Sequence, residues 1–215
     1  MKIIITGASG MVGEGVLLEC LKDKRVEQVL VVGRRSCGHQ HPKLREILHK
    51  DFFNLTPIAK ELSGYDGCFF CLGVSSIGMT PEDYKRMTYD LTLEMARILQ
   101  PLNPELTFCY VTGMHTDEHS KRNWARVKAA TENELMRLFK NAYMFRPGGM
   151  YAQPGQKNLK RGYKPFEAIV FPVFKLFFPN WICRLEEVGQ AMMNCVERHP
   201  QKHVLEVVDI KAVAR

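Results

Sequence analysis

The stretch that decides the fold is Met1-Lys2-Ile3-Ile4-Ile5-Thr6-Gly7-Ala8-Ser9-Gly10-Met11-Val12-Gly13. The β-branched run within it suits a strand that is buried on both faces. We expect Gly7 to allow a tight turn, Gly10 to let the main chain approach phosphates, and Gly13 to let a helix pack closely on the strand. The helix is indicated by apolar residues at helical spacing, namely Val16, Leu17, Cys20 and Leu21. The stretch therefore predicts a dinucleotide-binding turn.

A second apolar run, residues 29–32, ends in Gly33-Arg34-Arg35. An acidic residue at this position would hold the ribose 2′-hydroxyl of NAD, and no acid is present. Two guanidinium groups can instead clamp a 2′-phosphate, so the sequence favours NADP(H) over NAD(H). The alternative interpretation is a solvated basic turn.

The remaining chain alternates short apolar runs with helical patterns. The runs at 68–72, 108–112 and 142–145 read as buried parallel strands, and the patterns at 84–98 and 124–138 read as amphipathic helices. A helix at 185–196 and a last strand at 204–208 follow. We predict an α/β, Rossmann-type doubly wound parallel sheet with a small C-terminal helical cap. Residues 1–215 would form a single NAD(P)-binding domain, with 147–184 as a small substrate or lid region.

In these motifs the chain resembles the atypical short-chain dehydrogenase/reductase superfamily, and within it the Tat-interacting-protein-like, NmrA-like and NAD-dependent epimerase-like proteins. The resemblance covers most of the chain. It implies that the glycine turn binds the cofactor through Gly7, Ser9, Gly10, Met11, Val12 and Gly13. It further implies that Asp51 and Phe52 contact the adenine, that Leu72 and Gly73 line the cofactor, and that Pro147 closes the nicotinamide side.

The predicted catalytic residues depart from the superfamily pattern. Its members carry a tyrosine four residues before a lysine on one helix, whereas this chain has Trp124 and Lys128. The resemblance implies that Lys128 bonds the nicotinamide ribose. An indole only donates a hydrogen bond and cannot exchange a proton at neutral pH as an activated tyrosine does.

The serine that polarises the substrate carbonyl in the superfamily has no plain counterpart. Thr112 is the nearest hydroxyl to that position, and Gly113 is the alternative occupant. His115 and Thr116 remain candidates for a replaced acid or donor, and histidine has a suitable pKa for that work.

Two functions follow from these residues. The first is hydride transfer between NADP(H) and a small carbonyl or alcohol, with a non-standard site. The second is a non-catalytic NADP(H)-binding redox sensor that acts through a protein partner, which the missing tyrosine favours. A sugar-nucleotide epimerase or dehydratase fits poorly, because such enzymes need the tyrosine and a larger substrate domain.

The lid region combines a cationic loop with an apolar segment. The loop 154–162 carries basic side chains that suit an anionic substrate or the cofactor phosphates. The segment 163–183 is apolar on more than one face, but its prolines and charges argue against a spanning helix. We expect it to pack over the cleft or against a second subunit as a homodimer, with shallow membrane contact less favoured.

Composition sets further limits. The chain has 215 residues, of which 46% are apolar, enough for one full core. Met1 and Lys2 lead directly into the first strand, which predicts a cytoplasmic protein without a signal peptide. The formal charge of +7 is spread over several segments, so we expect no nucleic acid partner.

The cysteines and histidines predict neither a disulfide framework nor a metal site. Seven scattered cysteines suit a reducing compartment. Cys68 and Cys71 would point to opposite faces of a strand. Cys37, His39 and His41 lack the further ligands that a tetrahedral site needs.

Overall fold

The computed structural model describes residues 1–159 and 162–215. Lys160 and Arg161, two of the basic residues of the predicted cationic loop, lie outside this part. The core of the fold is a seven-stranded parallel sheet in the order β3-β2-β1-β4-β5-β6-β9. Its strands are β1 (Lys2–Thr6), β2 (Gln28–Gly33), β3 (Leu44–Leu48), β4 (Gly67–Phe70), β5 (Thr107–Val111), β6 (Ala142–Arg146) and β9 (Val204–Glu206). The predicted Rossmann-type doubly wound sheet is confirmed, with the strand order reversing between β1 and β4.

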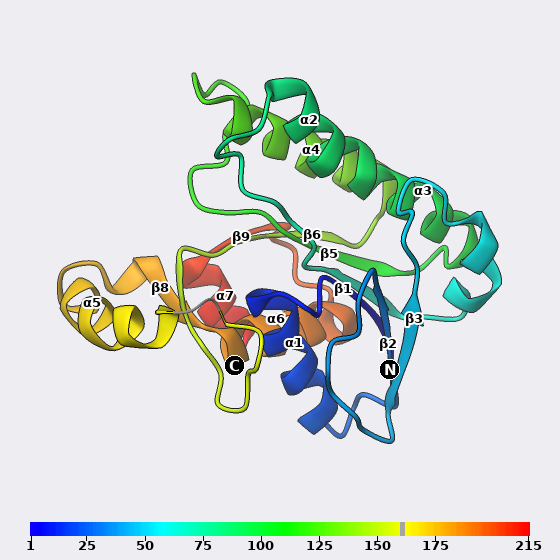
Figure 1. Ribbon diagram of the computed structural model, residues 1–215, viewed down its shortest axis with the longest axis horizontal. Helices are drawn as coiled ribbons and strands as arrows, with labels where there is room; N and C mark the ends of the chain where they lie inside the picture. The colour runs from blue at the N-terminus through cyan, green and yellow to red at the C-terminus, as the bar shows by residue number, and fades with distance from the viewer. Residues whose placement is uncertain (160–161) are drawn as a thin grey trace.

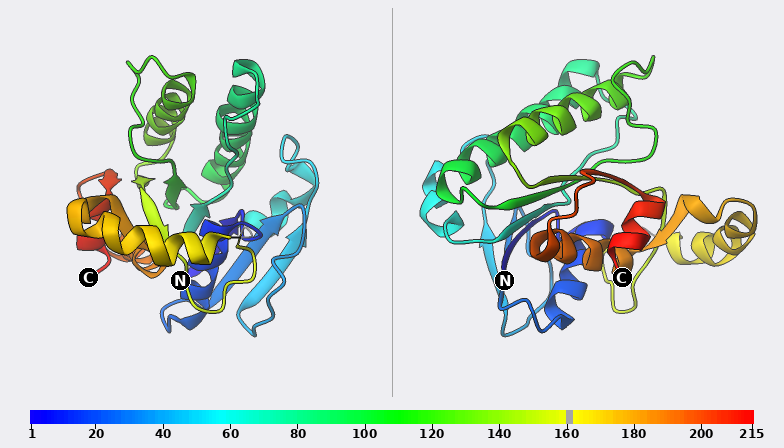
Figure 2. Two further views of the ribbon diagram at one scale, coloured as in Figure 1. Left: turned by 60° about the vertical axis from the view of Figure 1, so that its left-hand side comes forward. Right: turned by 180° about the vertical axis from the view of Figure 1, so that it is seen from behind.

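Helices cover both faces of this sheet (Figures 1 and 2). One face holds α1 (Met11–Lys22), α6 (Leu185–Arg198) and α7 (Val207–Val213). The other holds η1 (Thr56–Leu62), α2 (Pro81–Lys85), η2 (Arg86–Asp90), α3 (Leu91–Leu102) and α4 (Asn123–Leu138). Each layer has its own apolar core, because the central strands β1, β2, β4, β5 and β6 are largely buried and send alternate side chains to each face.

Two glycines bring α1 and α6 unusually close together. A Cβ atom on Gly15 would lie 2.7 Å from the Leu185 side chain, and one on Gly189 would lie 2.8 Å from Cβ of Glu19. Such contacts leave no room for a methyl group, so both positions are restricted to glycine by packing. The helix after the glycine turn is thereby fixed from behind by the last long helix.

The remaining elements form a small appendage beside the sheet. β7 (Gly149–Tyr151) and β8 (Ile182–Arg184) pair in parallel, and between them lie α5 (Tyr163–Phe177) and η3 (Pro179–Trp181). Figure 1 shows α5 extending beyond the sheet on the side opposite β3. Of the described helices, none is long and apolar enough to cross a membrane.

Several predicted element boundaries were wrong. The strand predicted at 68–72 ends at Phe70, and the one at 108–112 ends at Val111. The single helix predicted at 84–98 contains a π-helical turn, η2. The strand predicted at 204–208 ends at Glu206, because the Glu206 amide donates to Asp209 in a capping box that starts α7.

Cys68 and Cys71 lie on opposite sides of the sheet, as the strand geometry predicted. Cys68 belongs to the core beneath α3, whereas Cys71 packs against the core beneath α1. All seven cysteines are free thiols.

Candidate functional site

The glycine turn joins β1 to α1 at the carboxyl end of the central strand. Gly7 has φ +74°, and a Cβ atom there would lie 2.7 Å from the backbone of Cys71 and Leu72. A Cβ atom on Gly13 would collide with the backbone of Gly7. In contrast, a Cβ atom on Gly10 would meet nothing closer than the Gly7 carbonyl oxygen at 3.4 Å. The fold thus requires glycine at positions 7 and 13, while the space beside Gly10 is open.

The first turn of α1 presents backbone amides beside that space. Gly10 is the N-cap residue, and no side chain of the described part caps the helix. The amides at the start of a helix attract anions through hydrogen bonding and the helix dipole.

The carboxylate of Glu14, in this first turn, is buried and fully engaged elsewhere. It lies 2.7 Å from His39 Nε2, and it accepts bonds from the amides of Lys157 and Asn158 at 2.7 and 2.8 Å. Groups from two other loops therefore contact both oxygens of this carboxylate. Sequence reasoning missed this residue, which has no motif signal.

Segments far apart in the sequence meet in a pocket of about 170 Å³ at the same edge of the sheet. Its lining includes five residues predicted to contact the cofactor, namely Arg34, Asp51, Phe52, Leu72 and Gly73. Lys50, Phe53, Val74, Met87 and Leu91 complete it. Arg35 is exposed and does not line this pocket. The basic residue Lys50 was not predicted, although it directly precedes Asp51.

Lys128 belongs to α4, and its side chain reaches the carboxyl end of β5. Its Nζ atom donates to the Thr112 carbonyl oxygen at 2.7 Å. Burial lowers the pKa of Lys128 to about 8, against the opposing effect of Glu132 one helical turn away. Lys128 is thus held at the sheet edge, and its ammonium group releases a proton more readily than that of an exposed lysine.

A buried acid, Glu132, organises the groups around Lys128. Thr112 Oγ1 donates to Glu132 Oε1 at 2.7 Å. Arg146 donates two hydrogen bonds to the same carboxylate, from Nε to Oε1 at 3.0 Å and from Nη2 to Oε2. Arg146 also donates to Glu206 Oε1 at 3.2 Å. These ion pairs raise the pKa of Arg146 and hold Glu132 as a paired carboxylate.

Sequence reasoning did not include Glu132 or Glu206. The spacing of four residues between Lys128 and Glu132 on one helix was the available signal. Glu206 follows the last strand and could not be placed beside β6 without the sheet order.

The other candidate side chains are divided between the interior and the surface. Thr116 Oγ1 donates to the Gly113 carbonyl oxygen at 2.8 Å, so it closes a local turn.

His115 is exposed, has φ +64° and lies edge-on to Trp181 with ring centroids 5.6 Å apart. It lines an open pocket of about 450 Å³ with Asp117, Ser120 and Arg122. Trp124 is half-buried in the first turn of α4.

The segment after β6 is packed tightly under the neighbouring loops. Pro147 is buried, and its carbonyl oxygen accepts from the Met114 amide at 3.3 Å. A Cβ atom on Gly148 would collide with the Trp181 backbone and the Met114 side chain. This packing fixes the segment predicted to close the nicotinamide side.

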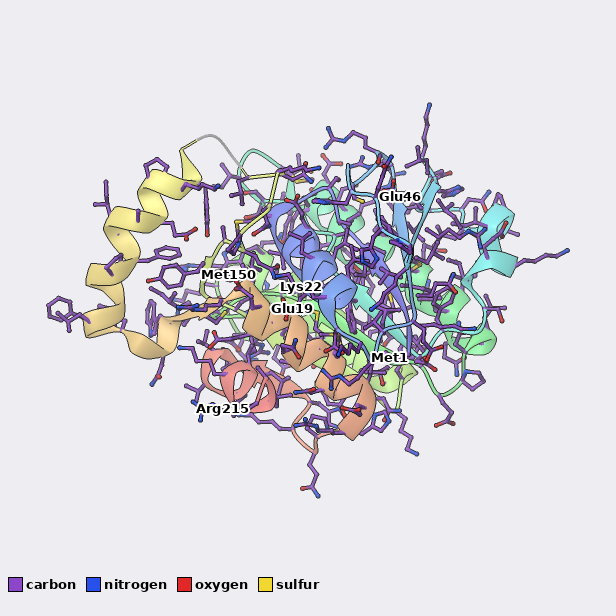
Figure 3. All side chains as sticks on the ribbon, turned by 90° about the horizontal axis from the view of Figure 1, so that it is seen from below. Met1, Glu19, Lys22, Glu46, Met150 and Arg215 are labelled. Atoms are coloured by element: carbon purple, nitrogen blue, oxygen red, sulfur yellow. The ribbon has the colours of Figure 1, made fainter. Side chains whose placement is uncertain are left out.

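The loop beyond β7 is anchored on α1. Gln153 Nε2 donates to Glu19 at 2.7 Å, and Gln156 Nε2 donates to the Met11 carbonyl oxygen at 2.6 Å. Lys157 Nζ donates to the Gly38 carbonyl oxygen at 3.0 Å. In Figure 3, Glu19 marks α1 and Met150 marks the strand from which the loop departs. The described part of the predicted cationic loop therefore lies against the start of α1 and the loop after β2.

Comparisons of sequence identify relatives at low identity. No known family model matches the chain. It is 28% identical over 144 residues to leucinostatins biosynthesis cluster protein T of Purpureocillium lilacinum, covering 64% of this chain and 52% of that protein. It is 26% identical over 149 residues to protein HTATIP2 of Rattus norvegicus, covering 68% and 61%. It is 22% identical over 199 residues to the mitochondrial protein FMP52 of Meyerozyma guilliermondii, covering 89% and 83%. The matches to the first two relatives thus span about half to three fifths of their lengths.

Solved structures with the same fold include nucleotide-sugar enzymes. The Helicobacter pylori ADP-L-glycero-D-manno-heptose-6-epimerase superposes with a TM-score of 0.70 at 16% identity, covering 99% of this chain and 80% of that one. The Bordetella bronchiseptica enzyme WbmF, in complex with NAD+, gives 0.67 at 16% identity, covering 98% and 76%. At these identities the likeness concerns the fold, which is of the Rossmann type.

Proposed function

We propose that this chain is an atypical short-chain dehydrogenase/reductase-like protein that binds NADP(H) and transfers hydride to a small carbonyl or from an alcohol. Its relatives at 22–28% identity and its Rossmann-type fold support the proposal. The observation that carries the proposal is the pocket at the strand ends. It gathers Arg34, Asp51, Phe52 and Leu72 from three separate loops, beside a glycine turn with open space at Gly10.

The adenine half of the dinucleotide fits the residues present. The apolar side chains of Phe52 and Leu72 suit the faces of the adenine ring. Arg34, with the exposed Arg35 beside it, supplies the guanidinium groups that a 2′-phosphate requires. The backbone amides after Gly10, with Ser9 in the turn, would hold the pyrophosphate. The donor set therefore favours NADP(H) over NAD(H).

The nicotinamide half would lie toward β5 and β6. When bound, the nicotinamide ring supplies or accepts a hydride. Lys128 would bind the ribose hydroxyls and Pro147 would bound the ring, while Thr112 positions Lys128 through its carbonyl oxygen. The Thr112 hydroxyl already donates to Glu132, which leaves His115 as the proposed group that exchanges a proton with the substrate.

We further propose that residues 147–184 form the substrate lid of a single domain. The anchoring of Gln156 and Lys157 on α1 and on the loop after β2 supports this role, since both of these segments are proposed to bind the cofactor. A cytoplasmic location and a small-molecule substrate, with no nucleic acid partner, stay predictions.

A second function, a redox sensor that binds NADP(H) without turnover, is favoured by Trp124. A half-buried indole replaces the tyrosine of the superfamily on the helical turn before Lys128, so the usual proton donor is missing. Turnover decides between the two functions.

The first experiment is a calorimetric titration with NADPH and, separately, NADH. We expect the unaltered protein to bind NADPH more tightly. The double variant Arg34→Ala/Arg35→Ala should weaken NADPH binding by about tenfold or more, because charge-assisted bonds to the 2′-phosphate are lost, and leave NADH binding nearly unchanged. Arg97→Ala, an exposed arginine on α3, is the matched control. Equal losses for both cofactors would contradict the 2′-phosphate assignment.

The second experiment follows NADPH oxidation with a panel of small aldehydes and ketones. Measurable turnover supports the reductase, and bound NADPH without turnover supports the sensor. In the reductase, Trp124→Tyr should raise the rate, because it restores a phenol at the superfamily spacing to Lys128. An unchanged rate with NADPH still bound would count against a simple loss of the proton donor.

A further inference from the structure

The outward side of α5 carries an exposed apolar stripe. The positions that face away from the molecule follow helical spacing and are Pro165, Ala168, Ile169, Pro172, Leu176 and Phe177. Ile169 is 72% exposed, Leu176 78% and Phe177 69%. Large apolar side chains this exposed in one continuous stripe mark an interaction surface.

The opposite side of α5 is anchored to β7 and to the residue that follows it. Phe171 is buried and lies edge-on to Tyr151 with ring centroids 5.1 Å apart. Tyr163 donates its hydroxyl to the Met150 carbonyl oxygen at 2.6 Å, and Glu167 accepts from the Ala152 amide at 3.0 Å. The helix is therefore attached by one side and presents the other away from the sheet (Figures 1 and 2).

The sequence of the segment that contains the stripe is rich in basic residues. Between Pro154 and Leu185 the sequence has six basic residues and one acidic residue. The one acid, Glu167, accepts the Ala152 amide on the anchored side, while Lys164 and Arg184 are exposed at the two ends of the segment. An apolar helix face flanked by lysine and arginine complements a surface that is apolar within and anionic at its rim.

A second copy of the chain fits this surface less well than a lipid surface does. A two-fold dimer through α5 would bring the same basic segments together and add like-charge repulsion. With 15 residues and an internal proline, α5 is suited to lie in the plane of a membrane and not to cross it. The sequence analysis also offered packing of this whole segment over the cleft. That alternative would leave the exposed stripe unexplained.

We propose that α5 docks on the surface of an anionic phospholipid membrane, with the side chains of Ile169, Leu176 and Phe177 inserted between the head groups. The chain would then be a peripheral membrane protein that holds its substrate lid against the lipid. This docking is independent of cofactor binding, since no residue of the stripe lines the dinucleotide pocket.

Vesicle flotation tests the proposal with the full-length chain. Vesicles of phosphatidylcholine alone are compared with vesicles that also contain phosphatidylglycerol. We expect flotation with the anionic vesicles, a loss of about tenfold in the bound fraction for Ile169→Glu/Leu176→Glu, and a loss with rising salt. Leu48→Glu is the matched control, because Leu48 is 63% exposed at the opposite edge of the sheet.

Three outcomes would overturn the proposal. The first is the absence of flotation with either vesicle, and the second is equal flotation of the double variant and the unaltered protein. The third is a dimer in light scattering that Ile169→Glu/Leu176→Glu converts to a monomer without any vesicle binding, which would assign the stripe to a second copy. Circular dichroism melting of each variant shows whether it is folded, and both altered positions are exposed, so we expect unchanged melting.

Discussion

Lys128 should give the stability of this protein a distinct pH dependence. Burial lowers the pKa of its ammonium group from 10.5 to about 8 in the folded state. Between these two pH values the unfolded chain holds a proton that the folded chain has released, so raising the pH favours folding. Each pKa unit corresponds to about 1.4 kcal/mol, and the whole shift therefore to about 3 kcal/mol.

The perturbation is Lys128→Met, which keeps the length of the side chain and removes the titrating group. We expect the free energy of unfolding of the unaltered protein to rise by about 3 kcal/mol relative to the variant between pH 8 and pH 10.5. Below pH 8 the difference between the two proteins should be constant. The cysteines and tyrosines whose pKa burial raises also titrate in this range, but they are common to both proteins and cancel.

Urea unfolding followed by circular dichroism at a series of pH values measures this difference. Lys121→Met is the control, because Lys121 is exposed and its removal should leave the two curves parallel. Parallel curves for Lys128→Met as well would refute the reasoning, since they would mean that Lys128 is solvated. A titration of isotopically methylated lysines by nuclear magnetic resonance gives the pKa directly.

Three further perturbations have expected outcomes. Gly7→Ala should destabilise the fold by more than 1 kcal/mol in urea unfolding, because its Cβ atom would press on backbone atoms and its φ is positive. Gly10→Ala should change the stability by less than about 1 kcal/mol and weaken NADPH binding in calorimetry. Equal losses of stability in the two variants would contradict this contrast. Glu132→Ala should lower the free energy of unfolding by about 3 kcal/mol, because it leaves the partly buried Arg146 without its main partner, and Glu132→Gln should lower it less. An unchanged stability of Glu132→Ala would show that the cluster is solvated. Glu14→Ala should speed proteolysis within residues 153–159, since two amides of that loop lose their acceptor, and an unchanged cleavage rate would argue against the anchoring.

The sequence predicted most of the sheet, and several of the residues it singled out line one pocket at the edge of that sheet. Strand runs such as 29–32 and 142–145 are apolar on both faces, which is a strong local signal. Arg34 and Leu72 follow such strands, and Asp51 follows the partly exposed edge strand β3, so the parallel order of the sheet brings all three to one edge.

The polar cluster could not be predicted in the same way. Glu132 depends on Thr112 and Arg146, which come from a loop and a neighbouring strand, and only tertiary packing brings the three together. The start of α7 at Val207 depends on a capping box that overrides the β-branched run at 207–208. The π-helical turn at 86–90 likewise has no signal in the hydrophobic spacing.

The close fit of α1 against α6 also sets the order in which the site can mature during synthesis. The glycine turn and α1 leave the ribosome well before α6, which covers Gly15 and Glu19. Until then the side of α1 that carries Gly15 and Glu19 lacks the helix that covers it in the folded protein. A nascent chain therefore exposes this side of α1 until α6 has been made, and we expect chaperones that recognise apolar segments to engage it there.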